Sequence, residues 1–340
     1  MSVLSPAAAS RVPLPAQAQS AAGRSAGRAL LLALLAGAPW ILLASVTLAW
    51  PDVGDWGRGP ELAMGALGLG ALLIAGGLLA LRFERLALRL AMVSPWAIAL
   101  GLFLSIWQIL TAKTGLLPMP FFPPPHALLE VYCDDGDRLI ASVVASLRLL
   151  GLGVAFGASI GFVTGLSIGW SRACGYWLHP VLRLIGPLPA TAWLPIAFFA
   201  FPSSWSASVF LIALAVGFPV AILTWSGVVS VDPAYYDVAR TLGANQRFLV
   251  LKVAIPAALP HVFVGLFMGL GASFAVLVTA EMMGVKAGLG FYLQWAQGWA
   301  AYANMYAALL VMSLMCSALI TILFKLRDRV LSYQKGNVQW

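Results

Sequence analysis

The sequence predicts an all-α membrane protein with about eight transmembrane helices. Hydrophobic residues make up 61% of the chain and charged residues only 9%, whereas soluble chains are about one quarter charged. The apolar residues fall into runs of about 20, which is the length that a helix needs to cross a bilayer. Lys and Arg cluster beside alternate runs, as they do in the cytoplasmic loops of membrane proteins.

Residues 1–88 are expected to form a tail and an N-terminal extension. Residues 1–28 are rich in Ala, Ser, Pro and Arg without apolar periodicity, which predicts a disordered cytoplasmic tail. Apolar runs at about 29–50 and 62–81 then predict that residues 29–88 contain two transmembrane helices. A cleaved signal peptide is the alternative for the first run. A retained helix is favoured, because the run is long enough to span and no small-residue cleavage site follows it.

Residues 89–335 are expected to form the transmembrane core. A long span at about 139–170 carries glycines four residues apart along one helix face, which lets helices approach closely in lipid. The span at about 176–201 contains several prolines and should be bent or broken. The glycines are Gly153, Gly157, Gly161, Gly165 and Gly169, and the other expected spans lie at about 93–111, 205–229, 261–285 and 305–324.

The charged residues predict the orientation of these spans. Arginines gather between the second and third spans, and basic residues follow the last span. The segments between the first and second spans and before the fourth span are acidic instead. The positive-inside rule then predicts that both termini lie in the cytoplasm, and it accounts for the net charge of +8 without a nucleic-acid partner. The acids are Asp52, Asp55, Glu61, Glu130, Asp134, Asp135 and Asp137.

A polar segment, residues 231–260, separates two late spans and is expected on the cytoplasmic side. Asp232 is suited to cap a helix, because its side chain can accept hydrogen bonds from free backbone N–H groups. Gly243 is suited to end that helix, since glycine adopts the left-handed conformation without strain. Asn245 is suited to cap a second short helix, and Pro256 is expected to end it.

The residues of this segment resemble the EAA loop of bacterial ABC importer permeases. The family pattern is Glu-Ala-Ala, three residues, Gly, and later an aliphatic residue, any residue, an aliphatic residue and Pro. The substitutions here, Asp for Glu and Val for the first Ala, keep the acidic and apolar character. The resemblance implies a coupling helix that docks into a groove on a cytoplasmic ATPase; an ordinary helix-turn-helix loop is the alternative. The matching residues are Asp237, Val238, Ala239, Gly243, Val253, Ile255 and Pro256.

From about Pro118 onward the chain resembles the nitrate, sulfonate and taurine branch of these permeases. The resemblance lies in passages 121–130, 145–169, 182–201 and 278–293, beside the loop. It implies a type I importer permease of the bacterial inner membrane, which forms the translocation pathway for a small anion such as nitrate, a sulfonate or taurine. The first two spans have no counterpart in the usual six-span member, and peripheral packing or assembly is their default role.

The resemblance also implies the partners of the chain. Two permease copies, usually identical, would pair in the membrane with two cytoplasmic ATPase subunits and a periplasmic or lipid-anchored substrate-binding protein. ATP and Mg²⁺ would be bound by the ATPase, because this chain has no Gly-rich nucleotide loop followed by Lys-Ser or Lys-Thr. The chain is therefore expected to be non-catalytic and to hold no cofactor.

Four residues are candidates for the translocation pathway. Arg148, Arg183 and Glu281 lie within or near span interiors, where a charge costs about 2.5–3.5 kcal/mol and must face protein or water. The arginines could attract anions in the pathway or anchor helices by ion pairs and carbonyl bonds. Glu281 is expected to pair with an Arg or with Lys286. Trp193, in the Pro-rich span, is the fourth candidate.

Two other classes of membrane protein compete with this interpretation. An ion-gradient-driven secondary transporter would be expected to show an internal repeat and acids within its spans, and such acids are nearly absent. A membrane enzyme would need a cluster of catalytic or metal-binding side chains. The histidines and cysteines are scattered instead, which predicts no metal site and no disulfide. They are His126, His179, His261, Cys133, Cys174 and Cys316.

Overall fold

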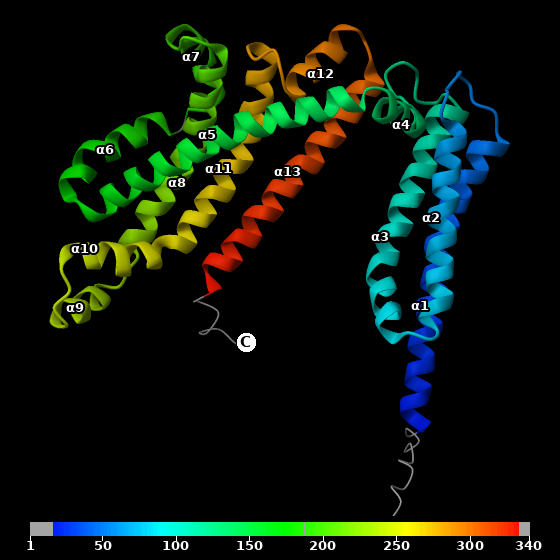
Figure 1. Cartoon of the computed structure of the whole chain (residues 1–340), viewed down its shortest axis with the longest axis horizontal. Coiled ribbons are helices and arrows are strands. Elements are labelled where there is room, and N and C mark those ends of the chain that lie inside the picture. The colour runs from blue at the N-terminus through cyan, green and yellow to red at the C-terminus, as the bar shows by residue number, and fades with distance from the viewer. Residues whose placement is uncertain (1–15, 187, 333–340) are drawn as a thin grey trace, which may run out of the picture. The chain divides into compact units, whose positions relative to one another are not determined.

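The chain folds into helices that group into two compact units (Figure 1). The computed structural model describes residues 16–186 and 188–332, and these residues contain no strand. Unit 1 comprises Met1–Cys133 and unit 2 comprises Asp134–Trp340. The division differs from the boundary at residue 88 that the sequence suggested, because the third span packs against the first and joins unit 1.

Among the described residues, seven helices are long and apolar enough to cross a membrane, and an eighth span results if one bent pair is counted. The pair is α6 (Arg172–Ile185) with Ala190–Ala200, and its two parts differ in direction by 90°. The break that the prolines predicted in this span is confirmed. So is the predicted all-α membrane fold. The seven helices are Leu30–Ala49, Gly59–Ala80, Glu84–Lys113, Gly136–Trp170, Ser204–Val229, Gln246–Met283 and Tyr302–Val330.

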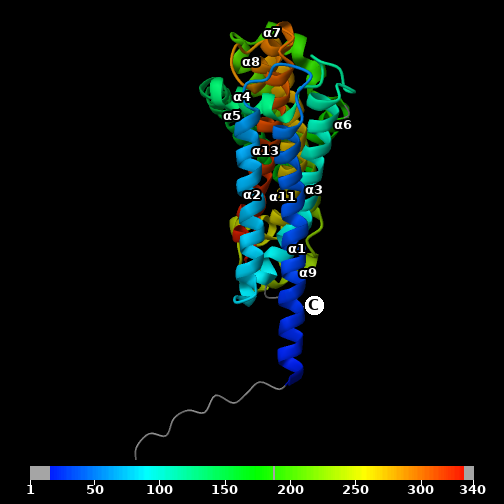
Figure 2. The same ribbon diagram turned by 90° about the vertical axis from the view of Figure 1, so that its right-hand side faces the viewer.

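Unit 1 is built on three long helices that lie side by side (Figures 1 and 2). They are α1 (Ala16–Ala49), α2 (Gly59–Ala80) and α3 (Glu84–Gln108). Small and large apolar side chains interdigitate between them, and two polar bonds reach from one helix to the backbone of another. Trp40 Nε1 donates to Ala97 O at 3.0 Å, and Ser105 Oγ donates to Pro39 O at 3.1 Å. The buried cluster contains Ala36, Trp40, Leu43, Ala44, Ala63, Ala66 and Leu73.

The expected N-terminal tail is described only in part. Residues 1–15 lie outside the described residues, and α1 begins at Ala16, so residues 16–28 continue the first span as helix instead of forming a disordered segment. The alanines and the absence of proline in 16–28 favour this conformation.

A buried lysine closes one end of unit 1. Lys113 lies in a π-helical turn, Ile109–Lys113, that follows α3, and its side chain is fully buried. Its Nζ lies 2.8 Å from Asp52 Oδ1 and donates to the carbonyls of Thr47, at 3.0 Å, and Trp50. These carbonyls belong to the last turn of α1, where a helix leaves its acceptors unpaired. Lys113 therefore satisfies two backbone acceptors at the end of α1 and connects that end to the turn that follows α3.

A buried histidine lies at the start of α4 (Pro125–Asp134) in the same unit. His126 Nδ1 is within 3.2 Å of the Gln108 side-chain amide, and its ring meets Trp56 edge-on at 5.7 Å. Burial lowers the pKa of His126 below its ordinary value of 6.5, and the charge of Lys113 adds to this effect, whereas the charge of Asp52 opposes it. The ring is therefore held in its neutral form.

In unit 2 the predicted glycine series packs against a neighbouring helix. The glycines of α5 (Gly136–Trp170) face α8 (Ser204–Val229), and a Cβ added at Gly157 would lie 2.5 Å from the backbone oxygen of Ala213. At Gly161 and Gly165 the nearest atoms are also backbone oxygens, of Gly217 and Ala221. The expectation that this series allows close helix approach is confirmed.

A neighbouring face of α8 repeats this packing against α11 (Ile255–Met283). A Cβ at Gly265 would meet Val220 Cα at 2.9 Å, and a Cβ at Gly269 would meet Val216 Cα at the same distance. Glycines thus bring the backbones of α5, α8 and α11 together, and this three-helix packing forms the centre of unit 2.

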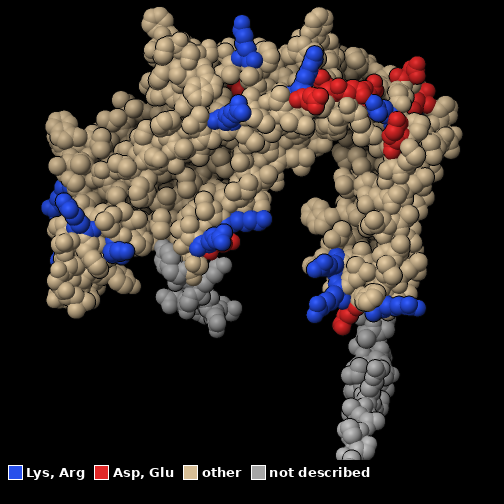
Figure 3. Space-filling view, in the orientation of Figure 1, with Lys and Arg blue, Asp and Glu red and all other residues tan. Residues whose placement is uncertain are grey.

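Charged side chains mark the two ends of unit 1 (Figure 3). Acids lie at the connection between α1 and α2, whereas arginines lie at the connection between α2 and α3, at the other end of these helices. In unit 2, basic side chains gather over α9 (Pro233–Thr241), α10 (Gln246–Phe248) and the end of α13 (Tyr302–Val330) (Figure 3). Each unit therefore has one strongly basic end.

Candidate functional site

The polar loop between α8 and α11 begins with a short, well-capped helix. In α9 (Pro233–Thr241) the N-cap residue Asp232 accepts a hydrogen bond from the N–H of Ala234 at 2.9 Å. Gly243 has a φ of +87°, which ends the helix as expected. Asn245 caps the next helix, α10 (Gln246–Phe248), by accepting from Phe248 N at 2.9 Å. The caps and the glycine turn that the sequence predicted are confirmed.

The expectation that Pro256 ends the second helix is wrong. The helix runs without a break from Gln246 to Met283, and Pro256 lies in its interior. A π-helical turn, Leu249–Ala254, comes directly before the proline. Such a turn changes the hydrogen-bond register, and this lets the helix continue through a residue that has no N–H. The loop is thus joined directly to the span that follows it.

The surface of α9 and α10 is apolar and open. No residue of α9 is buried, and Leu242 is 83% exposed. Charged side chains stand beside these apolar ones: Asp237 Oδ1 lies 3.3 Å from Arg240 Nη1, one turn along the same helix. Large apolar side chains exposed beside charged ones are common where one protein binds another. The exposed apolar side chains are Tyr235, Val238, Leu242, Phe248 and Leu251.

One aromatic contact attaches α9 to the rest of unit 2. The ring of Tyr236 meets that of Trp170, at the end of α5, edge-on at a centroid distance of 5.8 Å. Tyr236 is partly buried there, and it packs against the small core formed by Val228, Ala254 and Ala258. The helix is therefore fixed on one side and exposed on the other.

The four candidate pathway residues lie on different elements. Arg148 on α5 and Arg183 on α6 are exposed, Trp193 in η2 (Ala190–Trp193) is partly buried, and Glu281 on α11 is buried. Among the described residues, no hydrogen bond or ion pair joins any two of the four. The structure therefore does not bring them together as one site.

Glu281 has neutral partners instead of the Arg or Lys286 that the sequence suggested. Its Oε1 accepts from Ser146 Oγ and its Oε2 accepts from Gly290 N, each at 2.7 Å. Ser146 Oγ in turn accepts from Leu289 N at 2.9 Å. These bonds connect α5, α11 and the first turn of α12 (Leu289–Gly298), so the buried carboxylate holds three elements together.

The same turn requires a glycine. Gly288 has a φ of +104°, and a Cβ at this position would overlap the carboxylate of Glu281. The backbone of residue 288 thus separates the buried carboxylate from the surface above it. Any larger residue would disrupt both the turn and the hydrogen bonds of Glu281.

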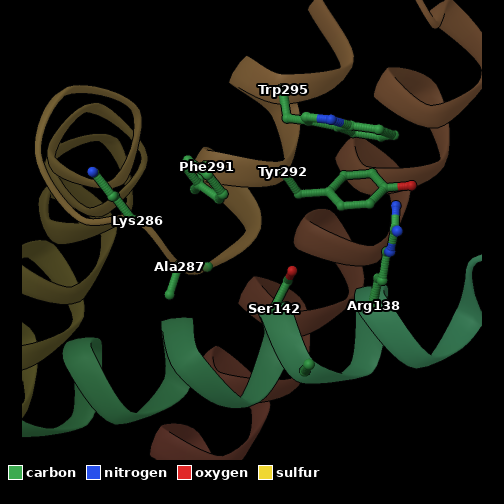
Figure 4. Close-up of a pocket in the computed structure, with 9 residues that line it drawn as sticks. Arg138, Ser142, Lys286, Ala287, Phe291, Tyr292 and Trp295 are labelled. Atoms are coloured by element: carbon green, nitrogen blue, oxygen red, sulfur yellow. The ribbon is translucent and has the colours of Figure 1, made fainter.

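A pocket of about 440 Å³ opens above this turn, beside α12 (Figure 4). In Figure 1, α12 lies at the end of unit 2 opposite α9. The first turns of α5 form one wall and α12 forms another. Tyr292 OH donates to Asp135 Oδ2 at 2.6 Å and accepts from Asn304 Nδ2 at 2.7 Å. The residues that face the pocket include Arg138, Ser142, Lys286, Phe291, Tyr292 and Trp295.

The comparisons with known proteins decide the family. The family described as "Binding-protein-dependent transport system inner membrane component" matches residues 154–332. This range is more than half of the chain and contains the whole loop between α8 and α11. The chain belongs to this family. It is the permease subunit of a type I ABC importer, and the ion-gradient-driven carrier is not supported.

Two of the relatives of this chain are named as permeases for nitrate or bicarbonate. The nitrate import permease protein NrtB of Synechocystis sp. is 29% identical over 249 residues, which are 71% of this chain and 88% of the relative. The bicarbonate transport system permease protein CmpB of Synechococcus elongatus is 33% identical over 232 residues, 64% of this chain and 80% of the relative. A probable ABC transporter permease protein of Brucella melitensis is 32% identical over 193 residues, 56% and 77% of the two chains.

Unit 1 of the permease lies outside the residues that the family match covers. It begins at residue 154, within α5, so α1 to α4 all precede it. The two short helices of the loop, the glycine-packed helices and the Glu281 turn all fall within the match, apart from the first half of α5. The elements that a permease of this family shares are thus concentrated in unit 2.

Sequence reasoning missed most of the residues that line the outer pocket of the permease. The sequence predicts no role for Arg138, Ser142 or Tyr292. The available signal was the recurrence of Phe291, Tyr292 and Trp295 around one face of a short helix that lies beside the acidic segment.

Proposed function

We propose that this permease forms the translocation pathway of an ATP-driven importer for small anions in the bacterial cytoplasmic membrane. Two copies of the chain pair in the membrane, and partner ATPase subunits bind ATP and Mg²⁺ and hydrolyse the nucleotide. A periplasmic or lipid-anchored binding protein delivers the solute. The names of the nitrate and bicarbonate relatives support an anionic solute, and the exposed loop of unit 2 supports a cytoplasmic partner.

The observation that carries the proposal is the open surface of α9 and α10. Asp237, Val238 and Ala239 form the middle of the docking helix, and Gly243 sets the turn that follows it. Val238 and Leu242 project apolar side chains into solvent, where burial against a partner would stabilise the complex. Ile255 and Pro256 begin α11, so they connect the docked helix to a membrane span.

This proposal fixes the orientation of the permease. The docking surface must face the cytoplasm, because that compartment holds the ATPase. The basic side chains over α9, α10 and the end of α13 then lie inside, in agreement with the positive-inside rule. Both termini are cytoplasmic in this arrangement, and the pocket lined by Tyr292 and Trp295 lies at the outer end of unit 2.

The pathway residues take different roles in this proposal. Arg148 and Arg183 are exposed and make no ion pair among the described residues, so they are suited to attract an anion along the pathway. Trp193 Nε1 is buried without a hydrogen-bond partner, which leaves a donor in the broken span. Glu281 acts as a structural acceptor, because its bonds to Ser146 and Gly290 use both carboxylate oxygens.

The test is co-purification of the permease with the ATPase encoded beside it, followed by an ATPase assay in lipid. Asp237→Arg replaces the acid of the docking helix and is expected to reduce ATPase retention by about tenfold or more, since one misplaced charge in an interface costs several kcal/mol. Asp328→Arg is the matched control, because Asp328 is also an exposed acid paired with an arginine of its own helix. Its ATPase retention should equal that of the wild type.

Two results would contradict the proposal. If the wild-type permease purifies without any ATPase, it lacks the partner that an ATP-driven importer requires. If Asp237→Arg and Asp328→Arg retain the ATPase equally, the docking surface lies elsewhere on the molecule.

A further inference from the structure

The outer pocket of unit 2 combines free hydrogen-bond donors with aromatic walls (Figure 4). Its volume of about 440 Å³ falls within the range of about 300–1,000 Å³ that small-molecule sites occupy. Arg138 and Ser142 come from α5, Lys286 from the turn before α12, and three aromatic residues from α12. Elements that are far apart in the sequence therefore build one concave surface.

The donors of this pocket have few partners within the chain. Lys286 is exposed, and no hydrogen bond or ion pair engages its ammonium group among the described residues. Arg138 has one contact with a carboxylate, from Nε to Asp135 Oδ1 at 3.5 Å, and its guanidinium lies 5.7 Å from the centroid of the Trp295 ring. The outer nitrogens of Arg138 therefore remain available to a ligand.

Ser142 differs from another helical serine of the same span. Ser167 on α5 donates to the carbonyl four residues before it, at 2.7 Å, which is the usual local bond of a serine in a helix. The hydroxyl of Ser142 has no partner in the part of the chain that the structure describes, and its oxygen points into the pocket between Arg138 and Lys286 (Figure 4). Ser142 is thus a third free donor.

Two carboxylates close to the pocket, those of Asp135 and Glu281, are already compensated by donors. Asp135 accepts from Tyr292 OH at 2.6 Å and contacts Arg138 and Asn304. Burial, followed by the bond to Asp135, raises the pKa of Tyr292 above its ordinary value of 10.0, so its hydroxyl stays protonated and keeps donating. Glu281 lies beneath Gly288 and uses both oxygens on Ser146 and Gly290. The groups left for a ligand are therefore cationic or hydroxyl donors.

The walls of the pocket are mostly apolar. Phe291, Tyr292 and Trp295 present ring surfaces, and Ala141 and Ala287 add methyl groups. Nitrate and bicarbonate have no apolar part that could use such walls. An aromatic or aliphatic body would displace water from these rings, and this burial of apolar surface stabilises a complex.

We propose that this pocket binds an organic anion, with a sulfonate or carboxylate group held by Arg138, Ser142 and Lys286 and an apolar body against Phe291 and Trp295. The inference rests on the proposed function, because it narrows the substrate class of the importer from small anions in general to organic anions. An anionic lipid offers the same chemistry, a charged oxygen group attached to an apolar body, and it is the other source of such a ligand.

The binding test uses benzenesulfonate as the probe and the full-length permease in nanodiscs of zwitterionic lipid. Saturation-transfer NMR should detect transfer to the aromatic protons of benzenesulfonate. Nitrate should displace benzenesulfonate only weakly, with a Kd at least about tenfold higher than that of benzenesulfonate. This ratio corresponds to about 1.4 kcal/mol from the apolar walls. Lys286→Gln is the decisive variant, because Lys286 is exposed and its loss should not affect folding.

The charge variants should weaken this binding by a measurable factor. Lys286→Gln and Arg138→Gln are each expected to raise the Kd of benzenesulfonate about fivefold to tenfold, and Ser142→Ala about threefold, in line with the strengths of charged and neutral hydrogen bonds. Lys325→Gln removes a lysine from the opposite end of unit 2 and should leave the Kd unchanged.

The same experiment distinguishes the solute from a lipid. The permease in nanodiscs that contain phosphatidylglycerol should bind benzenesulfonate with the same Kd as the permease in zwitterionic nanodiscs. If the anionic lipid displaces benzenesulfonate in the wild type but does not compete in Lys286→Gln, the pocket is a lipid site and the substrate inference is overturned. Equal binding of benzenesulfonate by Lys286→Gln, Arg138→Gln and the wild type would also overturn it.

ATP-driven uptake into proteoliposomes separates this inference from the proposed function. The complete complex of permease, ATPase and binding protein is tested with nitrate, bicarbonate and benzenesulfonate. Uptake of nitrate or bicarbonate without any binding of benzenesulfonate would leave the importer in place and overturn the organic-anion site. If no ATPase associates with the permease, the proposed function fails instead, whatever benzenesulfonate does.

Discussion

The glycines of the two units differ in how closely they bring helix backbones together. In unit 2, a Cβ at Gly157, Gly161 or Gly165 would lie 2.5 Å or less from a backbone oxygen of α8. In unit 1, a Cβ at Gly37 would first meet Ile74 Cγ1 at 2.7 Å and then the backbone oxygen of Gly70 at 3.0 Å. Side-chain ends can rotate or shift, whereas a helix backbone moves only as a whole. A methyl group at these positions of unit 2 is therefore expected to cost more stability than one at Gly37.

The units also differ in how they neutralise a buried charge. In unit 1, Lys113 pairs with Asp52 and with carbonyls of α1. In unit 2, the carboxylate of Glu281 is surrounded by neutral donors, a serine hydroxyl and a peptide N–H. Lys113 thus relies on an opposite charge and on backbone carbonyls. Glu281 relies on neutral donors instead, and the backbone N–H among them follows the turn that Gly288 makes possible. The difference is that unit 1 balances its buried charge with an ion pair, whereas unit 2 does so with hydrogen bonds from neutral donors.

Substitution of the central glycine should give the largest effect. Gly161→Ala is expected to lower the free energy of unfolding by about 3 kcal/mol, because the new methyl group forces α5 away from the backbone of Gly217. Gly37→Ala in unit 1 should cost less, about 1 kcal/mol, since the Ile74 side chain can move and the backbone oxygen of Gly70, at 3.0 Å, needs to shift only slightly. Unfolding in detergent, followed by circular dichroism, measures both.

Gly151→Ala provides the control for this comparison. Gly151 lies on the same helix as Gly161 but has no atom within 4 Å of an added Cβ. The change should be neutral or stabilise the helix by about 0.5–1 kcal/mol, because alanine has the higher helix propensity. Equal costs at positions 161 and 37 would contradict the distinction between backbone and side-chain contacts.

Removal of the buried lysine should have the next largest effect, confined to unit 1. Lys113→Met leaves Asp52 and the end of α1 without their donor, and it should lower the free energy of unfolding by about 2–3 kcal/mol, less than for a fully buried pair because Asp52 is 20% exposed. Thermal unfolding of the variant tests this. The double variant Lys113→Met with Asp52→Asn should recover much of the loss, and a double variant no better than the single one would argue against the ion pair.

Loss of the buried carboxylate in unit 2 should cost slightly less. Glu281→Ala leaves the Ser146 hydroxyl and the N–H of Gly290 without an acceptor, and we expect destabilisation of about 2 kcal/mol from these unmade bonds. Chemical unfolding in detergent measures the change. Thr279→Val alters a local bond on the same helix and should change the free energy of unfolding by no more than about 0.5 kcal/mol. An equally small change for Glu281→Ala would contradict the structural role of Glu281.

The pH dependence of unit 1 should show the smallest effect. The pKa of His126 is lowered in the folded chain, so the unfolded chain takes up a proton first as the pH falls through 6.5. The stability that the neutral ring provides is thus complete above pH 6.5 and is lost progressively below it. The melting temperature of the wild type should fall more steeply than that of His126→Phe when the pH is lowered from about 7.5 to about 5.5. Parallel curves for the two proteins would contradict this assignment.

Local features of this fold could be predicted from the sequence because short-range rules determine them. The caps at Asp232 and Asn245 and the turn at Gly243 depend on neighbouring residues only. The glycine series needed no knowledge of its partner, since a four-residue period places all its members on one face of α5. The bend in the Pro-rich span followed from the missing backbone donors of proline.

Features that depend on distant contacts could not be predicted in this way. The bond between Ser146 and Glu281 joins residues that are 135 positions apart, and no local pattern indicates it. The outer pocket likewise needs the start of α5 to meet α12. At Pro256 the local rule was sound but incomplete, because the π-helical turn that accommodates the proline depends on packing around Leu249 and Ala254, which are both buried. The coupling role of Asp237 remains a prediction of the same sequence reasoning.

The helix from Gln246 to Met283 connects the loop of unit 2 to the Glu281 turn. Its regular α-helical part, α11, has 29 residues and is therefore about 44 Å long at 1.5 Å for each residue. A tilt of one degree about the loop end of α11 would displace its other end by about 0.8 Å. The length of α11 thus sets how far the Glu281 turn would move for a given tilt at the loop.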